Sequence, residues 1–161
     1  MDSSKPTYIS FEDAKRKLEA FCAYQDRCHL EVINKLYNLK VSSNIHDDIL
    51  VHLIETNFLN EERFACSFAR GKHRISSWGK SRIIMELKMR KITPFLIKKA
   101  LQEIPDDLYF ETLNRISHQR WNSINEPNIL KKKQKLQAYL YRKGYEMEYI
   151  YDCIKQLEND M

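Results

Sequence analysis

Residues 58–92 read FLNEERFACSFARGKHRISSWGKSRIIMELKMRKI, and they carry the clearest helical pattern in the chain. Asn60 stands before two glutamates, which is typical of a helix N-terminus because a capping side chain and first-turn acids complement the unpaired amides there. Phe64 and Phe68 follow at helical spacing, so they are expected to face a core. The pattern therefore predicts a helix that begins directly after Asn60.

Two further helix starts follow. Ser77 is expected to cap a second helix, whose inward positions include Ile83 and Leu87. Thr93 precedes a proline and predicts a third helix, because proline at the first helical position lacks only an amide that has no partner there. Residues 59–104 are therefore expected to form a unit of three helices.

The apolar spacing of this unit recurs on both sides of it. Leu36, Leu87 and Leu140 are anchors that lie about 50 residues apart. Apolar residues follow every anchor at offsets of five, nine, fourteen and seventeen, and one spacing in three copies predicts a tandem repeat. In order of offset, these residues are Val41, Ile92 and Tyr145; Ile45, Leu96 and Tyr149; Leu50, Leu101 and Ile154; and Leu53, Ile104 and Leu157.

The predicted fold is all-α, with three tandem three-helix repeats stacked into an elongated, curved array. A tail over 1–9 precedes repeats over 10–58, 59–104 and 105–161. Because a three-helix unit of this size has a marginal core, stacked copies are expected to bury one another's remaining apolar surface. The 161 residues include only 3 Gly and 4 Pro, which disfavours an all-β fold and a Gly-rich or Pro-rich disordered chain.

The outer copies follow the same plan. In the first copy, Ser10 is expected to cap the first helix and Asn44 the third. In the third copy, helices are expected over 107–123, 127–143 and 147–158. The inward positions predicted for the first two helices of the first copy are Phe11, Ala14, Leu18, Phe21 and Cys22, then Leu30, Ile33, Leu36 and Tyr37.

Basic residues are concentrated in the middle copy. The chain has 27 Lys and Arg against 22 Asp and Glu, a net charge of +5, and residues 60–92 carry the whole excess. A second basic run stands at an expected helix start, where it opposes the helix dipole and has no evident local structural reason. This clustering favours a polyanionic partner. The candidate binding residues are Arg63, Arg70, Lys72, Arg74, Lys80, Arg82, Lys88, Arg90, Lys91, Lys131, Lys132 and Lys133.

The segment 71–80, GKHRISSWGK, is expected to connect two helices of the middle copy. Gly71 and Gly79 can let the backbone approach a phosphate, and Trp78 can stack on a base. The interpretation that we favour for Trp78 is a hydrophobic cap on the bundle, and Gly71 is equally explained as the residue that ends a helix. A basic face that is simply solvated also remains open.

No pattern in the chain indicates catalysis or a metal site. The phosphate-loop, serine-hydrolase, zinc-protease and dinucleotide motifs do not occur. His46 beside two aspartates is the nearest approach to a ligand set, but His52 does not share its helix face. We therefore expect no enzyme, no cofactor and no metal. The cysteines form no CxxC pair and are expected to be free, mostly core-facing thiols; they are Cys22, Cys28, Cys66 and Cys153.

The N-terminal residues lack the apolar region of a signal peptide, and no run approaches the roughly 20 apolar residues that span a bilayer. The sequence therefore predicts a cytoplasmic protein without a membrane contact. A transcription factor is disfavoured, because it usually dimerises on paired half-sites and no zipper heptad is visible. The expected protein is a monomer.

The stretch 58–92 resembles the signature of the RecX family of recombinase regulators. That family reads an aromatic residue, then Leu-Asp-Asp-x-x-Phe-Ala, then aromatic and basic residues, then Gly-x-x-Arg-Ile-x-x-Glu-Leu and a terminal Gly-Ile. Asn60 and Glu61 stand where two aspartates are usual, and Lys91 replaces the usual terminal glycine. The matching positions are Leu59, Phe64, Ala65, Phe68, Arg70, Gly79, Arg82, Ile83, Glu86, Leu87 and Ile92.

The resemblance extends over essentially the whole chain and implies three tandem three-helix repeats. It implies a cytoplasmic protein of DNA repair, recombination and the SOS response that binds RecA protein and the filament of RecA on single-stranded DNA. Such a regulator is expected to lie along the filament groove, to limit filament extension and to inhibit the recombinase, ATPase and coprotease activities, without a cofactor.

Two alternatives stay open from the residues themselves. One is a helical nucleic-acid-binding module without a recombinase partner. The other is a protein–protein scaffold whose positive charge is incidental.

Overall fold

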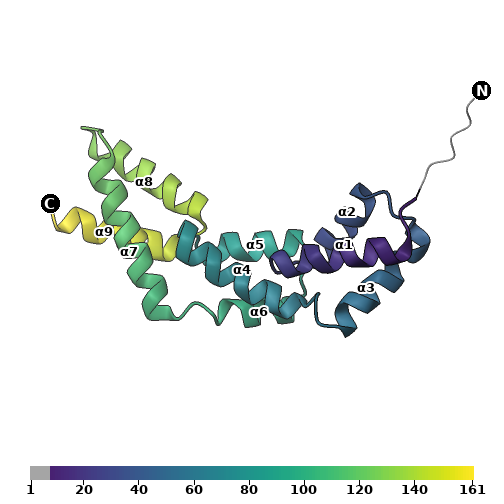
Figure 1. Ribbon diagram of the computed structural model, residues 1–161. Helices are drawn as coiled ribbons and strands as arrows, with labels where there is room; N and C mark the ends of the chain where they lie inside the picture. The colour runs from purple at the N-terminus through teal and green to yellow at the C-terminus, as the bar shows by residue number, and fades with distance from the viewer. Residues whose placement is uncertain (1–7) are drawn as a thin grey trace, which may run out of the picture.

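The computed structural model describes residues 8–161, which form an elongated, curved row of helices (Figure 1). No residue in this range lies in a strand, so the predicted all-α array is confirmed. Residues 1–7 of the expected tail lie outside the described part. Repeat 1 holds α1 (Phe11–Tyr24), α2 (His29–Asn38), the short 3-10 helix η1 (Ser43–Ile45) and α3 (His46–Glu55); repeat 2 holds α4 (Glu61–Ser76), α5 (Lys80–Met89) and α6 (Pro94–Leu101); repeat 3 holds α7 (Asp106–Ser123), α8 (Ile129–Lys143) and α9 (Met147–Asn159).

One helix end recurs in all three repeats and explains why an apolar residue follows each anchor leucine by five positions. Just beyond α2, α5 and α8 stands a residue with positive φ: 57° at Lys40, 59° at Lys91 and 99° at Gly144. The amide of the following residue donates to the carbonyl of the anchor leucine. This is the Schellman arrangement, which packs the apolar residue after the left-handed one onto the last helical turn. The bonded pairs, all buried, are Val41 and Leu36 at 3.0 Å, Ile92 and Leu87 at 3.1 Å, and Tyr145 and Leu140 at 3.2 Å.

Lys91→Gly is expected to stabilise the protein by about 0.5–1 kcal/mol, because glycine adopts a positive φ without the steric cost that a side chain carries there. Urea unfolding followed by circular dichroism measures the free energy of unfolding. Lys88→Gly is the control, because Lys88 lies exposed inside α5; this variant is expected to lose about 1 kcal/mol. Equal losses in both variants would contradict backbone strain at Lys91.

Of the five predicted caps, three are confirmed and two, Asn44 and Ser77, are wrong. Ser10, Asn60 and Thr93 each accept a hydrogen bond from the amide three residues later, at 3.2, 2.9 and 3.4 Å. Asn44 does not cap α3, because it lies inside η1 and α3 begins without a side-chain cap. The chain enters α3 through one tighter helical turn instead.

The turn between α4 and α5 is shorter than the sequence predicts. Helix α4 continues through Gly71, so only Ser77, Trp78 and Gly79 connect the two helices. Ser77 ends α4 with a φ of 56°, and Gly79 takes the N-cap position of α5. The predictions that Ser77 caps α5, that Gly71 ends a helix and that the whole decapeptide is a connector are therefore wrong.

Other predicted elements need smaller corrections. In α2, Val32 is buried, whereas Tyr37 is 60 % exposed and does not face the core. Helix α8 begins at Ile129, later than predicted, because Asn128 accepts a hydrogen bond from the Lys131 amide at 3.0 Å and so caps it. Helices α7 and α9 lie within one residue of their predicted bounds.

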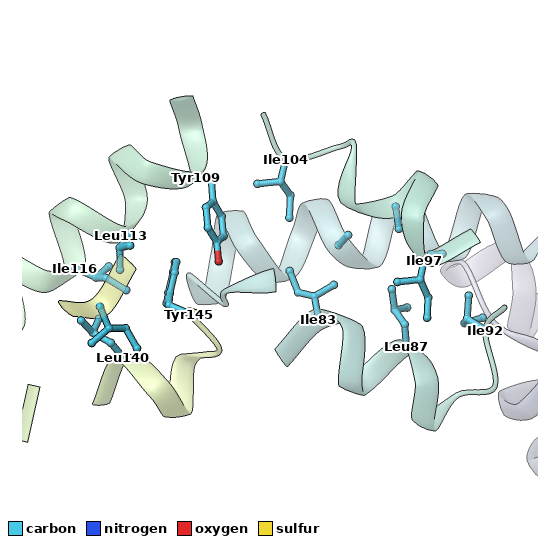
Figure 2. Close-up of a cluster of buried hydrophobic side chains, with 14 of the residues drawn as sticks. Ile83, Leu87, Ile92, Ile97, Ile104, Tyr109, Leu113, Ile116, Leu140 and Tyr145 are labelled. Carbon is cyan, nitrogen blue, oxygen red and sulfur yellow. The ribbon is translucent and has the colours of Figure 1, made fainter. Parts of the chain in front are cut away.

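Apolar side chains gather in two cores. Repeat 1 has its own core around Leu18, Leu36 and Leu53. Repeats 2 and 3 share one continuous core, and Figure 2 shows Tyr109 and Tyr145 at its middle, between the aliphatic side chains of the two repeats. Repeats 2 and 3 are therefore packed against each other more extensively than either is against repeat 1.

Backbone contacts hold repeats 2 and 3 together. The Gly79 amide donates to the Lys143 carbonyl at 2.7 Å, and the Ser81 amide donates to the Gly144 carbonyl at 3.0 Å. A Cβ built on Gly79 would stand 2.3 Å from the Gly144 carbonyl carbon. The two backbones can approach this closely only because both glycines lack a side chain.

Two buried tyrosines complete this junction. The Tyr109 hydroxyl accepts from the Lys80 amide at 3.1 Å and donates to the Glu146 carboxylate at 2.7 Å. The Tyr145 hydroxyl donates to the Ser77 carbonyl at 2.8 Å. Burial raises the pKa of both phenols, so each stays protonated and able to donate.

The junction between repeats 1 and 2 is more polar. Asp26 accepts from Arg63 Nε at 2.7 Å and from the Ser67 hydroxyl at 3.2 Å. The His29 amide donates to the Glu61 carboxylate at 3.2 Å. Repeat 1 also places Cys28 in the shared core and Leu30 against it, so polar and apolar contacts together join it to repeat 2.

Candidate nucleic-acid interface

Several of the twelve basic residues predicted from the sequence have acidic partners. Arg63 pairs with Asp26 at the junction of repeats 1 and 2. Its guanidinium also donates to the carbonyls of Asn57 and Phe58 at 3.1 Å. Arg63 therefore holds the turn between α3 and α4 against α4. The ion pairs are Arg63 with Asp26 at 2.7 Å, Arg70 with Glu103 at 2.9 Å, Lys80 with Asp106 at 3.5 Å, Arg90 with Glu86 at 2.8 Å and Lys133 with Glu158 at 2.6 Å.

Three predicted cations gather around two aromatic rings of repeat 2. Lys72 Nζ lies 5.6 Å from the centre of the Phe68 ring and 4.9 Å from that of Trp78. The Arg82 guanidinium lies 4.1 Å from the Trp78 ring, and the Arg90 guanidinium lies 4.9 Å from the Phe68 ring. Cations above ring faces are attracted by the ring quadrupole, so these side chains are held in place. The charge of Lys72 and Arg82 stays available, whereas Arg90 is also paired with Glu86.

Repeat 3 brings further cations to the turn that precedes Trp78. Lys143 Nζ donates to the Ser76 carbonyl at 2.9 Å, and an Arg115 nitrogen lies 3.4 Å from the Ser77 hydroxyl oxygen. The turn between α4 and α5 is therefore contacted by positive side chains from two repeats.

The same pattern continues towards the start of α8. The Arg120 guanidinium and Lys143 Nζ lie 5.0 and 5.8 Å from the Tyr139 ring. Lys132 Nζ lies 4.2 Å from the ring of Trp121, the residue after Arg120. A chain of contacts thus connects α8 with the C-terminal end of α5.

We call this set the basic ridge. Seven cations from repeats 2 and 3 contribute to it, and four aromatic residues alternate with them. Positive charge interleaved with aromatic rings suits single-stranded nucleic acid, because cations neutralise phosphates and ring faces accept any base. The basic ridge comprises Lys72, Arg82, Arg90, Arg115, Arg120, Lys132 and Lys143 with Phe68, Trp78, Trp121 and Tyr139.

Arg115, Arg120 and Lys143 are not among the residues predicted from the sequence, because repeat 3 has no excess of positive charge. One local signal was present: a cation follows an aromatic residue by four positions at Phe68, at Trp78 and at Tyr139. That spacing brings two side chains together on one face of a helix. Arg74, Lys88, Lys91 and Lys131 are exposed, and none of them contacts an aromatic ring of the ridge.

The glycines and the tryptophan of the connector have structural roles. Gly79 is buried and its amide is bonded to Lys143, so the prediction that its backbone approaches a phosphate is wrong. Gly71 lies inside α4, where an added methyl group would have open space within 4 Å. Trp78 packs on the shared core at its edge, which confirms the hydrophobic cap that we favoured.

Histidines and cysteines form no candidate centre. His46 is buried, with Nε2 2.9 Å from the Val41 carbonyl oxygen. Over residues 8–161, no three His, Cys, Asp or Glu side chains are placed to hold a metal ion. The cysteines are free, and burial raises the pKa of the Cys22 and Cys28 thiols to about 11, which keeps them protonated and unreactive at neutral pH. No helix of the described part is long and apolar enough to cross a membrane.

Comparison with known proteins relates the three-helix units to one family. The family model of the second three-helix domain of RecX matches residues 60–101, and that of the third matches residues 106–154. The regulatory proteins RecX of Bacillus cytotoxicus and Bacillus thuringiensis are each 25 % identical to this chain over 141 residues, 88 % of it. The match spans 52 % of each relative, so this chain covers about half the length of the curated relatives.

Solved structures show the same fold. The crystal structure of RecX from Lactobacillus salivarius has a TM-score of 0.78 and 23 % identity, covering 91 % of this chain and 96 % of that one. A second crystal structure of a regulatory protein RecX also has a TM-score of 0.78, with 20 % identity, covering 94 % of this chain and 82 % of that one. The two domain matches, together with this likeness of fold, show that the chain belongs to the RecX family of regulatory proteins.

Proposed function

We propose that this protein regulates the cognate RecA recombinase, mainly as an inhibitor. It binds RecA and the filament of RecA on single-stranded DNA, and it limits filament extension, ATP hydrolysis and strand exchange. Membership of a family of regulatory proteins supports this proposal. The observation that carries it is the basic ridge, which extends over two repeats instead of forming a closed pocket.

The proposal places the protein in the cytoplasm, in DNA repair, recombination and the SOS response. It acts as a monomer, without a cofactor and without catalysing a reaction. An elongated helical array suits this role, because a long surface can contact neighbouring protomers of a filament simultaneously. One bound regulator then disturbs several ATP-bearing interfaces.

The basic ridge supplies the contact with nucleic acid. Each phosphate that a ridge cation neutralises releases condensed counterions, so the logarithm of affinity falls with the logarithm of salt concentration by about 0.7 per contact on a single strand. Phe68, Trp78 and Tyr139 are partly exposed and add stacking surface that does not depend on base sequence, whereas Trp121 is buried. The proposal therefore includes DNA binding that is sensitive to salt and indifferent to sequence.

The test is the rate of ATP hydrolysis by cognate RecA on single-stranded DNA while this protein is titrated in. We expect the rate to fall at substoichiometric protein, because a regulator acting on the filament affects many RecA subunits, whereas competition for DNA needs far more protein. An unchanged rate with DNA binding intact would indicate a nucleic-acid module. An unchanged rate without DNA affinity at moderate salt would indicate a protein scaffold.

A further inference from the structure

A groove between α7 and α9 differs in chemistry from the basic ridge. It has a volume of about 380 Å³ and lies on repeat 3. Four residues of α7 and four of α9 line it. Along α9 they stand at spacings of three, one and three residues, so they share one helix face. The aromatic and polar residues among them are Phe110, Glu111 and Asn114 of α7 with Tyr149, Asp152 and Gln156 of α9.

The floor of this groove is aromatic and open to solvent. The Phe110 and Tyr149 rings meet edge to face, with centroids 4.8 Å apart. Phe110 keeps 41 % of its surface exposed. Exposed aromatic side chains in a concave site are typical of surfaces that bind a protein partner, because they offer much apolar area at a small entropic cost.

The rim of the groove is acidic. Glu111 and Asp152 line it, and both are exposed. No lysine or arginine of residues 8–161 is among its lining side chains. The carboxylate of Glu148, together with partial burial and the neighbouring Glu146, raises the pKa of Tyr149, as expected where the local potential is negative.

This charge selects the kind of occupant. A negative rim repels phosphates, so the groove does not continue the nucleic-acid contact of the basic ridge. It attracts lysine and arginine, and a guanidinium can also lie over an aromatic ring. Asn114 and Gln156 add amide groups that both donate and accept hydrogen bonds, which suits a polypeptide.

We propose that the groove between α7 and α9, called the acidic groove, is a docking site for a basic amphipathic helix of a protein partner. The apolar face of that helix packs on Phe110 and Tyr149, and the lysines or arginines that flank this face pair with Glu111 and Asp152. On the basis of the proposed function, this helix belongs to RecA itself. The protein then contacts the recombinase through the acidic groove and the nucleic acid through the basic ridge.

The test uses purified cognate RecA without DNA or nucleotide, with its affinity for this protein measured by biolayer interferometry. Glu111→Lys with Asp152→Lys is expected to weaken RecA binding on the order of tenfold or more, because each attractive pair becomes repulsive. Affinity for single-stranded DNA is expected to stay unchanged or to rise. Phe110→Ala, which alters no charge, is expected to weaken RecA binding as well.

Glu55→Lys with Asp160→Lys is the matched control, because it makes the same change of net charge at exposed positions outside the acidic groove. The control is expected to bind RecA like the wild type, and circular dichroism checks that all variants keep their helices. Wild-type affinity in both groove variants would overturn the docking site alone. Failure of the wild-type protein to bind RecA or to inhibit its ATPase would overturn both this inference and the proposed function.

Discussion

Gly79→Ala is expected to destabilise the protein by about 3 kcal/mol, the upper part of the range for overpacking a well-packed interior. The new methyl group would stand 2.3 Å from the Gly144 carbonyl carbon and 2.5 Å from the Tyr145 amide nitrogen. These are backbone atoms of repeat 3, which cannot rotate away as a side chain does. Repeats 2 and 3 must therefore separate, which breaks the bond of 2.7 Å between the Gly79 amide and Lys143.

Urea unfolding followed by circular dichroism measures this loss, and the chain offers a matched control. Gly71→Ala changes a glycine inside α4 that has nothing within 4 Å of its added methyl position. Alanine is a better helix former than glycine, so this variant is expected to gain about 0.5–1 kcal/mol. If Gly79→Ala were as stable as the wild type, the close approach of the two repeats would not be needed for stability.

Reversal of three ridge charges is expected to remove most of the affinity for nucleic acid. The variant Lys72→Glu with Arg82→Glu and Lys143→Glu changes the middle of the basic ridge, around the Trp78 ring and the Ser76 carbonyl. In a plot of the logarithm of affinity against the logarithm of salt concentration, losing three phosphate contacts makes the slope shallower by about 2. Affinity at low salt is expected to fall roughly a hundredfold. Inhibition of RecA should weaken in parallel.

Fluorescence anisotropy of a labelled single strand at several salt concentrations gives both the affinity and the slope. The matched control is Arg74→Glu with Lys88→Glu and Lys91→Glu, which makes the same change of charge at exposed positions of repeat 2 that contact no aromatic ring of the ridge. If this control lost as much affinity as the ridge variant, net charge would explain binding and the arrangement of the ridge would not matter.

Local sequence patterns predicted the helices and their repeat. Each anchor leucine and the apolar residue five positions later belong to one Schellman turn, as Leu87 and Ile92 do. Their constant spacing can therefore be recognised in the sequence. Asn60 and Thr93 were recognised as caps because a cap bonds an amide only three residues away. Such contacts lie within one helical turn, so the residues that make them stand together in the sequence.

The ends of α4 and α5 were predicted wrongly because contacts remote in the sequence set them. Serine is a residue type that commonly caps helices, but the Ser77 carbonyl accepts a hydrogen bond from the Tyr145 hydroxyl. Gly79 packs directly against the backbone of Gly144. No residue close to them in the sequence indicates that they contact Gly144 and Tyr145 of repeat 3.

The candidate site divides in the same way. The charge of residues 60–92 and the pairs of an aromatic residue with a cation four positions later can be read from the sequence, since they too are local. Arg115 and Lys143 join Trp78 in one surface only because repeat 3 packs against the turn between α4 and α5. The acidic groove likewise exists only where α7 lies against α9. Short-range hydrogen bonding and helical periodicity thus account for the elements of this protein, whereas the packing of one repeat on the next creates its surfaces.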